Sequence, residues 1–177
     1  VRHVGEAIAV VVAADPYAAA DGAERVAVDY EPLPAATTPG AADAPGAPRV
    51  NDGWPDNLVS ITTSAKGRPV EALAAAPVTV AARLAYPRVA GMPLETRGVL
   101  AAPDPIGNGL TVWTSTQVPF AVRSAIAPVV RLAEERIRVL VPDVGGGFGV
   151  KGHVYPEEIL VPAVARRLEG FSFADVQ

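Results

Sequence analysis

Hydrophobic and polar residues change their spacing twice in the N-terminal stretch of the chain. Residues 7–13 (AIAVVVA) form a continuous apolar run, which predicts a buried strand. Asp15 and Pro16 then supply an N-cap and a first helical residue, so an Ala-rich helix is expected over residues 17–25. Residues 26–30 (VAVDY) alternate as strand residues do. The order strand, helix, strand predicts a small α/β unit.

The regular spacing disappears over residues 34–57, where Ala, Pro, Gly and Asp dominate. Such a composition is typical of a surface connection, extended where Pro is dense. We therefore expect residues 41–57 to be a linker and the boundary between two domains.

Regular spacing returns from residue 58 onward. Alternation predicts strands and a helical period predicts helices within the same part of the chain. The expected strands are residues 58–64, 78–86, 94–101, 110–116 and 137–141, and the expected helices are residues 70–76, 120–130 and 157–168. Pro128 and Pro162 are unfavourable inside the last two helices. The fold class predicted for the whole chain is α+β.

The composition excludes several kinds of site. The chain of 177 residues has no Cys and only two His, so it cannot ligate an iron–sulfur cluster or build a thiolate or histidine-rich metal site. A formal charge of −4 disfavours a nucleic-acid partner. The apolar run at residues 7–14 is far too short for a membrane span, so a cytoplasmic protein is expected.

The most informative motif is GGGFGVK at residues 145–151, directly after a predicted strand. Consecutive glycines allow positive φ angles and a close approach of the backbone to a ligand, and their N–H groups suit an anion or an oxo group. A tight connection without a ligand explains the same glycines equally well. Asp143 is predicted to cap this loop.

Two phosphate-binding interpretations compete for the same residues. Gly147, Gly149 and Gly152 satisfy G-x-G-x-x-G after a strand, which keeps a nucleotide-dependent oxidoreductase open as an alternative. Pro156 and the absence of room for a second βαβ strand weigh against that fold. A Walker loop fails, because Gly152 rather than Ser or Thr follows Lys151.

Other polar residues have simpler interpretations. Gln117, in the segment TSTQVP at a strand end, has a carboxamide that can both donate to and accept from a ligand. Glu95 and Arg97 lie on one side of a strand, which predicts a structural ion pair or network. Glu157 and Glu158 fit the first turn of a helix, and His153 is expected to be a packing or surface residue.

Five segments occur in an order that resembles the molybdenum hydroxylase family of xanthine dehydrogenase, aldehyde oxidase and aerobic carbon monoxide dehydrogenase. They are VGEAIAVVVA, ADPYAAADGAERVAVDYEPLPA, PLETRGVLA, LTVWTSTQVP and VPDVGGGFGVK. The resemblance implies that residues 1–40 are the C-terminal part of a small α/β hammerhead domain. It implies that residues 58–170 are part of a mixed α+β molybdopterin-binding domain of the large subunit. Residues 171–177 do not resemble the family's continuation and are expected to be an atypical tail.

The resemblance also implies a site. Gln117 stands where the family has a glutamine that contacts the molybdenum centre, and Gly147, Phe148 and Gly149 match the backbone segment beside the cofactor. No catalytic residue is assigned, because the family's catalytic Glu lies beyond this chain. Gly152 occupies the position of a substrate-binding Glu in xanthine-oxidising members, which argues against purines. The run GHVYPEE is closer to the carbon monoxide dehydrogenase-like branch.

The implied parent activity is oxidative hydroxylation of an aldehyde, an N-heteroaromatic or carbon monoxide. The implied cofactor is molybdenum–molybdopterin, for which the cytosine dinucleotide form is one option. The implied partners are iron–sulfur and FAD subunits or domains. The chain is expected to be a fragment without cofactor and without activity on its own. The alternatives are an NAD- or FAD-dependent oxidoreductase using residues 147–152, and a non-catalytic remnant or partner-subunit-binding module.

Overall fold

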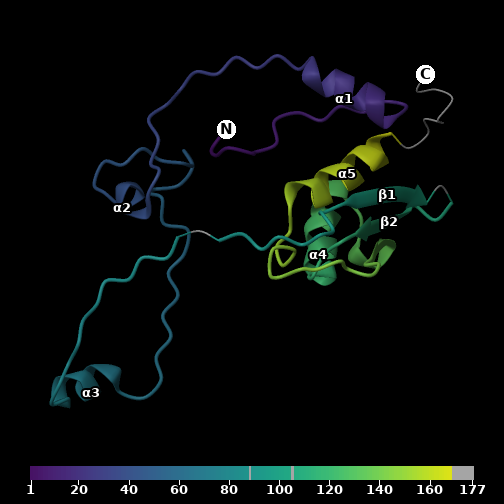
Figure 1. Ribbon diagram of the computed structural model, residues 1–177. Coiled ribbons are helices and arrows are strands. Elements are labelled where there is room, and N and C mark those ends of the chain that lie inside the picture. Colours follow the sequence, from purple (N-terminus) through teal and green to yellow (C-terminus); the bar gives the residue numbers. More distant parts are fainter. Residues whose placement is uncertain (88, 105, 169–177) are drawn as a thin grey trace. The chain divides into compact units, whose positions relative to one another are not determined.

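The computed structural model describes residues 1–87, 89–104 and 106–168 (Figure 1). The predicted tail at residues 171–177 lies outside the described residues. In chain order, the elements are α1 (Pro16–Glu24), α2 (Pro39–Ala42), α3 (Pro69–Ala75), β1 (Val99–Asp104), β2 (Gly109–Thr114), α4 (Pro119–Val130), the 3-10 turn η1 (Glu134–Arg136), β3 (Ile137–Leu140) and α5 (Pro156–Arg167). Helices beside a small mixed sheet confirm the α+β class. None of the helices in the described part of the chain combines the length and hydrophobicity needed to span a bilayer.

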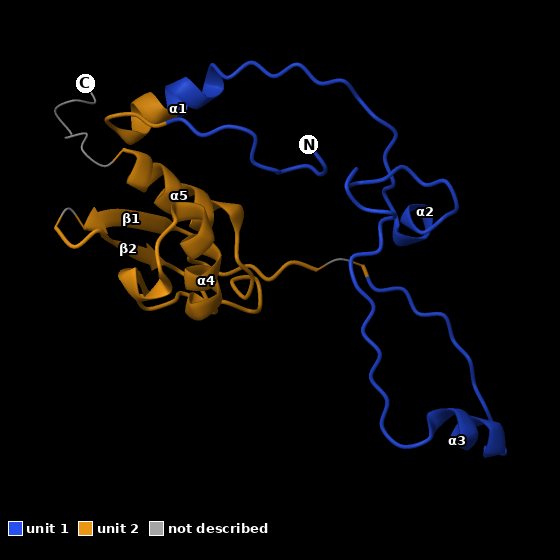
Figure 2. Cartoon of the chain, turned by 180° about the vertical axis from the view of Figure 1, so that it is seen from behind, with its two compact units in different colours: residues 1–11, 20–86 blue, residues 12–19, 87–177 orange. Residues whose placement is uncertain are grey.

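The chain divides into two compact units (Figure 2). Unit 1 comprises residues 1–11 and 20–86, and unit 2 comprises residues 12–19 and 87–177. The sheet and the helices α4 and α5 belong to unit 2, whereas α2 and α3 belong to unit 1.

The sheet of unit 2 has the strand order β1-β2-β3. β1 and β2 form an antiparallel hairpin, with Val99 opposite Thr114 and Asp104 opposite Gly109. β2 and β3 are parallel, and α4 connects them as a crossover helix. This connection places the carboxyl ends of β2 and β3 at one edge of the sheet.

The core of unit 2 lies between the sheet and the two long helices (Figure 1). α4 packs on β3 and α5 packs mainly on β1, and the two helices also contact each other. Residues of β2 alternate between buried and partly buried, so one face of the sheet is covered by the helices. The buried hydrophobic residues are Leu110, Val112, Val122, Ile126, Ala127 and Ile137. Pro128 and Pro162 lie inside α4 and α5 without ending them.

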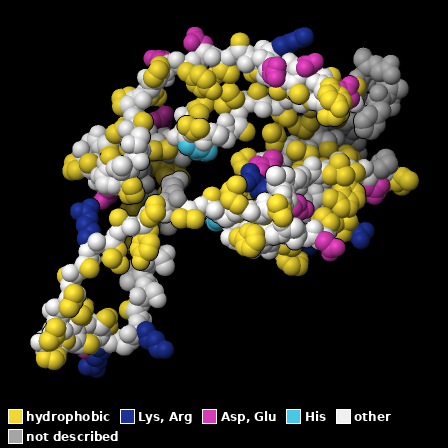
Figure 3. All heavy atoms as spheres, viewed as in Figure 1, with side chains coloured by type: hydrophobic (Ala, Val, Ile, Leu, Met, Phe, Trp, Pro, Cys, Tyr) yellow, Lys and Arg dark blue, Asp and Glu magenta, His cyan; other side chains and the backbone are white. Residues whose placement is uncertain are grey.

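Four of the predicted strands form no ladder, and the prediction was wrong for them. Residues 7–13, 26–30, 58–64 and 78–86 are assigned to no strand. A strand is completed by a hydrogen-bonded neighbour, and the described residues offer these four segments none. The run at residues 7–13, predicted to be buried, keeps Ile8 and Val10 half exposed. Figure 3 shows hydrophobic side chains along the extended segments that lead to and from α3.

The helices agree better with the sequence. Asp15 Oδ1 accepts hydrogen bonds from the N–H groups of Tyr17 and Ala18, both at 2.9 Å, which is the predicted N-cap of α1. The predicted strand at residues 94–101 begins only at Val99. Its first residues are instead held by contacts with a glycine-rich loop, because Glu95 N–H donates to the Gly145 carbonyl at 3.3 Å.

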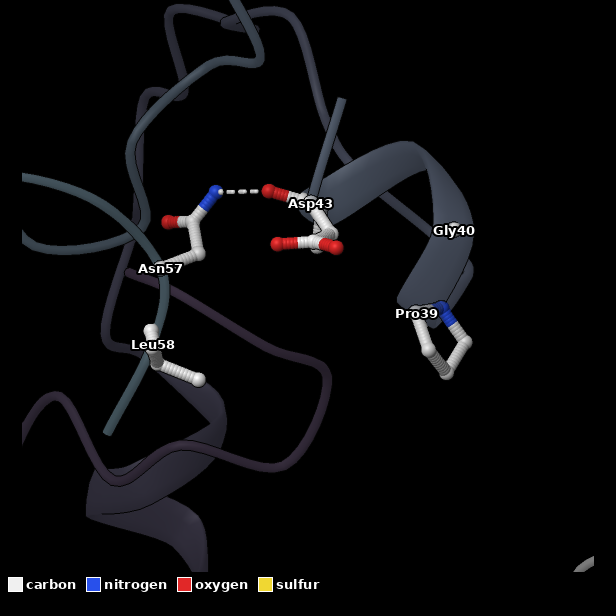
Figure 4. Close-up of a pocket in the computed structure, with 6 residues that line it drawn as sticks. Pro39, Gly40, Asp43, Asn57 and Leu58 are labelled. Carbon is white, nitrogen blue, oxygen red and sulfur yellow. Dashed lines mark hydrogen bonds between the residues drawn. The ribbon is translucent and has the colours of Figure 1, made fainter. Parts of the chain in front are cut away.

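The predicted linker contains a folded loop in unit 1. The side chain of Asn57 donates to the carbonyls of Ala42 and Pro48, each at 3.0 Å, and accepts from the Val50 N–H at 2.8 Å. These bonds close residues 42–57 into a loop that follows α2. Figure 4 shows Asn57 and Asp43 beside a hollow whose lining residues are Pro39, Gly40, Ala42, Asp43, Asn57 and Leu58.

Candidate functional site

Three segments that are distant in sequence meet at one edge of the unit 2 sheet. Residues 115–118 follow β2, and residues 141–155 follow β3, its parallel neighbour. Residues 91–98 precede β1, whose antiparallel pairing with β2 brings its first residue to the same edge. The contact is close, because a Cβ added to Gly91 would lie 2.8 Å from Val150 Cγ2.

Gln117 and the glycine loop lie side by side at this edge. The Gln117 Oε1 accepts a hydrogen bond from the Gly149 N–H at 3.1 Å. The main-chain N–H of Gln117 donates to the Lys151 carbonyl at 2.9 Å. The carboxamide is exposed and its Nε2 group remains able to donate to a ligand.

The loop has a shape that requires glycine. A Cβ at Gly147 would lie 2.6 Å from Gln117 Oε1, so the Gln117 side chain can keep its position only beside a glycine. Gly149 has a φ of +80°, in the left-handed region that favours glycine. Phe148 lies between them with a φ of +50° and an exposed fraction of 75%. A bulky residue in this conformation is uncommon and marks a backbone that its surroundings hold in place.

The loop presents unused hydrogen-bond donors. No acceptor among the described residues binds the N–H groups of Gly147 and Phe148. Together with the Gln117 Nε2 group, they form a set of neutral donors on one short stretch of surface. Such donors suit an oxygen-rich or anionic group, because an exposed N–H nest favours negative charge.

Beneath the loop, Glu95 joins Lys151 and Ser115. The Lys151 Nζ donates to Glu95 Oε2 at 2.6 Å and to Ser115 Oγ at 2.8 Å. The same Glu95 oxygen accepts from Ser115 Oγ at 2.6 Å and from the Gly145 N–H at 2.7 Å. These donors, led by Lys151, lower the pKa of Glu95 to about 2. Glu95 is therefore a carboxylate at neutral pH.

Arg97 belongs to a different ion pair, which corrects one prediction. The sequence predicts that Glu95 and Arg97 share one structural pair or network, but Arg97 Nε donates to Glu157 Oε1 at 2.8 Å. Its guanidinium also lies 3.8 Å from the centre of the Tyr155 ring. The two residues thus stabilise separate contacts, because each finds a closer partner on the segment after β3.

Hydrogen bonds of Glu158 and Tyr155 hold the first turn of α5 in place. Glu158, predicted in that turn, is buried and accepts from Thr114 Oγ1 at 2.8 Å and from the Tyr155 N–H at 2.9 Å. The Tyr155 hydroxyl donates to the Val150 carbonyl. α5 is therefore tied both to the end of β2 and to the glycine loop.

Two other sequence predictions have definite outcomes. Asp143, predicted to cap the loop, is exposed. The N–H of Gly145, at the start of the loop, donates to Glu95 instead. His153 is exposed and lies edge-on to Tyr155, with 6.5 Å between the ring centres. It is a surface residue with an aromatic neighbour.

Sequence reasoning did not find Ser115 or the role of Lys151. The sequence suggests a role for Lys151 only as the lysine of a phosphate loop, whereas in the structure its exposed fraction is 1%. One signal was present, because Lys66 and Lys151 are the only lysines in the chain and Lys151 directly follows the glycine motif.

Comparison with known proteins identifies this arrangement. The family described as "Molybdopterin cofactor-binding domain" matches residues 50–171, which include Gln117, the glycine loop and the Glu95–Lys151 pair. The chain belongs to this family.

Two of the similar proteins are named as the large subunit or large chain of an enzyme. The chain is 37% identical to the nicotine 6-hydroxylase large subunit of Paenarthrobacter nicotinovorans over 96% of its own length. It is 37% identical to the carbon monoxide dehydrogenase large chain of Hydrogenophaga pseudoflava over 84% of its length. It spans about a fifth of each relative, 21% and 20%.

A solved structure agrees. Quinoline 2-oxidoreductase from Pseudomonas putida 86 matches 88% of this chain, and 20% of its own, with a TM-score of 0.75 and 39% identity. As in the sequence relatives, the molybdopterin-binding domain of this chain corresponds to a segment of a larger polypeptide.

The dinucleotide-binding alternative is not favoured. In that fold, the glycine motif opens a helix whose N-terminus binds the pyrophosphate. Here residues 148–151 form a turn, and α5 begins only at Pro156. The Gly149 N–H donates to the side chain of Gln117 and is therefore not available to a pyrophosphate.

Proposed function

We propose that this chain forms one wall of the cofactor site in the large subunit of a molybdenum hydroxylase. Gln117 and the backbone of Gly147, Phe148 and Gly149 are the residues that contact the cofactor. The observation that carries the proposal is the hydrogen bond from the Gly149 N–H to Gln117 Oε1, which joins two predicted site segments.

The donor set fits this cofactor. The Gln117 Nε2 group and the N–H groups of Gly147 and Phe148 are neutral donors that suit its oxygen atoms and the edge of its pterin. The Gly149 N–H already donates to Gln117, so Gly149 would contact the cofactor through the rest of its backbone. When bound, the cofactor supplies a two-electron acceptor for oxidative hydroxylation. The residues of this chain hold and orient it.

The proposal extends to substrate and partners. Gly152 has no side chain that could bind a purine, and a Cβ there would lie 3.0 Å from the Gly149 carbonyl, so we propose a small aldehyde, N-heteroaromatic or carbon monoxide type of substrate. The proposed partners are iron–sulfur and FAD subunits or domains, which agrees with the absence of Cys. The cytosine dinucleotide form of the cofactor belongs to the same proposal.

The domain division is proposed with the function. Residues 1–40 are assigned to a hammerhead domain, residues 41–57 to a linker and residues 58–170 to part of the cofactor-binding domain. Support comes from the order of the motifs and from the family match over residues 50–171. A cytoplasmic location is proposed on the same grounds.

The test is analysis of the cofactor in a large subunit that carries this segment, produced in a host that makes molybdenum cofactor. We expect bound molybdenum and pterin. The change Gln117→Ala should lower kcat by about 10–100-fold, because it removes one positioned donor. The free energy of unfolding should change by less than about 1 kcal/mol, because the side chain is exposed.

Ser124→Ala is the matched control, since Ser124 is an exposed polar residue on α4. It should change neither kcat nor cofactor content. Full turnover with normal molybdenum content in Gln117→Ala would show that Gln117 does not contact the cofactor. A purified subunit that holds NAD or FAD without molybdenum and pterin, or that holds no cofactor, would contradict the proposed function itself.

A further inference from the structure

Three side chains form a closed polar cluster below the glycine loop, and each comes from a different segment. Glu95 precedes β1, Ser115 follows β2, and Lys151 ends the loop after β3. Lys151 is the most buried of the three, with a side-chain exposure of 0%, and Glu95 is partly open at 36%. A lysine at this depth requires a carboxylate and hydrogen-bond partners, because a buried unpaired ammonium is very costly.

The cluster holds both ends of the loop. At its start, the Gly145 N–H donates to Glu95 Oε2 at 2.7 Å. At its end, the Lys151 carbonyl accepts from the Gln117 N–H at 2.9 Å and from Thr116 Oγ1 at 3.3 Å. Lys151 therefore binds Ser115 with its side chain and Gln117 with its main chain.

We propose that Lys151 and Glu95 are positioning residues for the Gln117–Gly149 contact. Their ion pair sets the distance between the strand end that carries Gln117 and the loop that carries Gly147 to Gly149. Neither residue touches the cofactor in this assignment. The inference deepens the proposed function, on which its biological purpose rests, but the geometry it describes exists without a cofactor.

The electrostatic surroundings of Glu95 are simple. Lys151 is the charged group that acts on it among the described residues, since Arg97, two residues further on, pairs with Glu157. The pKa of Glu95 is lowered from 4.5 to about 2, chiefly by the Lys151 hydrogen bond and then by those of Ser115 and Gly145. The pair is therefore fully charged above pH 4.5 and is lost as the pH falls toward 2.

The experiment is amide hydrogen exchange by NMR on the 177-residue chain. The reporters are the amides of Gly145, Gln117 and Gly149, each compared with Leu110 and Val112 in the central strand. The variants are Lys151→Met, which keeps the length of the side chain without its charge, Glu95→Gln, and the double variant. Each single change should raise exchange at the reporters by about tenfold relative to β2, as expected for groups in one network. The double variant should raise it little further.

Arg123→Gln is the matched control. It removes the Arg123–Glu134 ion pair, at 3.1 Å, which lies between α4 and η1 and includes no loop residue. The reporter-to-strand ratio should stay within about twofold of the parent chain. Equal acceleration of the reporters and the strand in the Lys151 and Glu95 variants would mean that the pair only stabilises the fold, and the proposal would then be abandoned. Additive effects of the two changes would show that Lys151 and Glu95 do not act together, and the proposal would be abandoned in that case too.

A pH series gives a second readout when the protection of the reporters is divided by that of Leu110 and Val112, because a pair that only stabilises the fold would change both alike. In the parent chain, corrected for intrinsic exchange, reporter protection should fall between pH 4.5 and about 2, and Glu95→Gln should remove this step. If Lys151→Met does not fold, the proposal is tested by Glu95→Gln and by the pH series. Selective loosening together with no bound molybdenum in the large subunit would leave the positioning role intact and overturn only the proposed function.

Discussion

At residue 147, the backbone lies too close to the Gln117 carboxamide for any side chain to fit between them. The first atom of a side chain would lie 2.6 Å from Oε1 and 2.7 Å from Cδ of Gln117. The Gln117 carboxamide can turn away from this position only by giving up the hydrogen bond that its Oε1 accepts from the Gly149 N–H at 3.1 Å. The glycine at residue 147 is therefore what allows the loop to lie against the segment that follows β2.

This distance leads to a prediction for Gly147→Ala. The added methyl group should push the Gln117 side chain away, break its hydrogen bond with Gly149 and lower the free energy of unfolding by up to about 1 kcal/mol, the contribution of one exposed hydrogen bond. The measurements are urea unfolding and the amide shift of Gly149. Gly98→Ala is the control, because a Cβ at Gly98 meets nothing within 4 Å. Equal effects of the two changes would show that the close approach at residue 147 has no consequence.

Individual site residues differed in how well the sequence predicts them. Gln117 and residues 147–149 were predicted because each follows a strand and stands in a motif with a recognisable order. Ser115 and Lys151 were not connected, although their side chains lie 2.8 Å apart, because 36 positions separate them and their residue types suggest no pairing. Short-range patterns indicate elements, whereas a contact between segments depends on the sheet that brings them together.

The same limit applies to whole elements. Val80 and Val112 stand in segments with the same alternating pattern, yet Val80 is 90% exposed and Val112 is fully buried. β2 has a neighbour on each side and two helices on its face, whereas residues 78–86 have no paired strand among the described residues. Alternation encodes a potential strand, but its partner determines whether a ladder forms. The helices α1, α3, α4 and α5 depend on local hydrogen bonds, which explains their better agreement.

The loop after α2 gives a prediction at this scale. Asn57 makes the three hydrogen bonds that close residues 42–57, so Asn57→Ala should open the loop. We expect limited proteolysis to cut this segment several-fold faster in the variant, since loop cleavage depends on local opening. Asn51→Ala is the control, because only the main chain of Asn51 is hydrogen-bonded. Cleavage that begins inside β2, α4 or β3 in either protein would contradict the proposed division of the chain.

At the scale of the whole molecule, the groups around Gln117 are suited to hydrogen bonding and not to acid–base catalysis. Its donors near Gln117 are amides, and Glu95, the carboxylate bound to Lys151 and the loop, accepts three hydrogen bonds and has a pKa of about 2. A carboxylate so strongly stabilised is a poor general base at neutral pH, since its affinity for a proton is low. The described residues at this site can thus hold and orient a group, but they supply no matched acid or base.

The purified 177-residue chain should therefore show no hydroxylase turnover. Dye-linked oxidation of aldehydes, purines or carbon monoxide is measured before and after incubation with molybdenum cofactor, with a metal-free sample as the reference. We expect rates equal to the reference in both cases, even where metal analysis detects retained molybdenum, because general acid–base catalysis contributes about 10²–10⁴-fold and this wall lacks such a group. Gln117→Ala provides a second reference, in which any retained molybdenum should decrease. Turnover above the metal-free reference would mean that a proton acceptor exists within the chain, and the prediction would then be wrong.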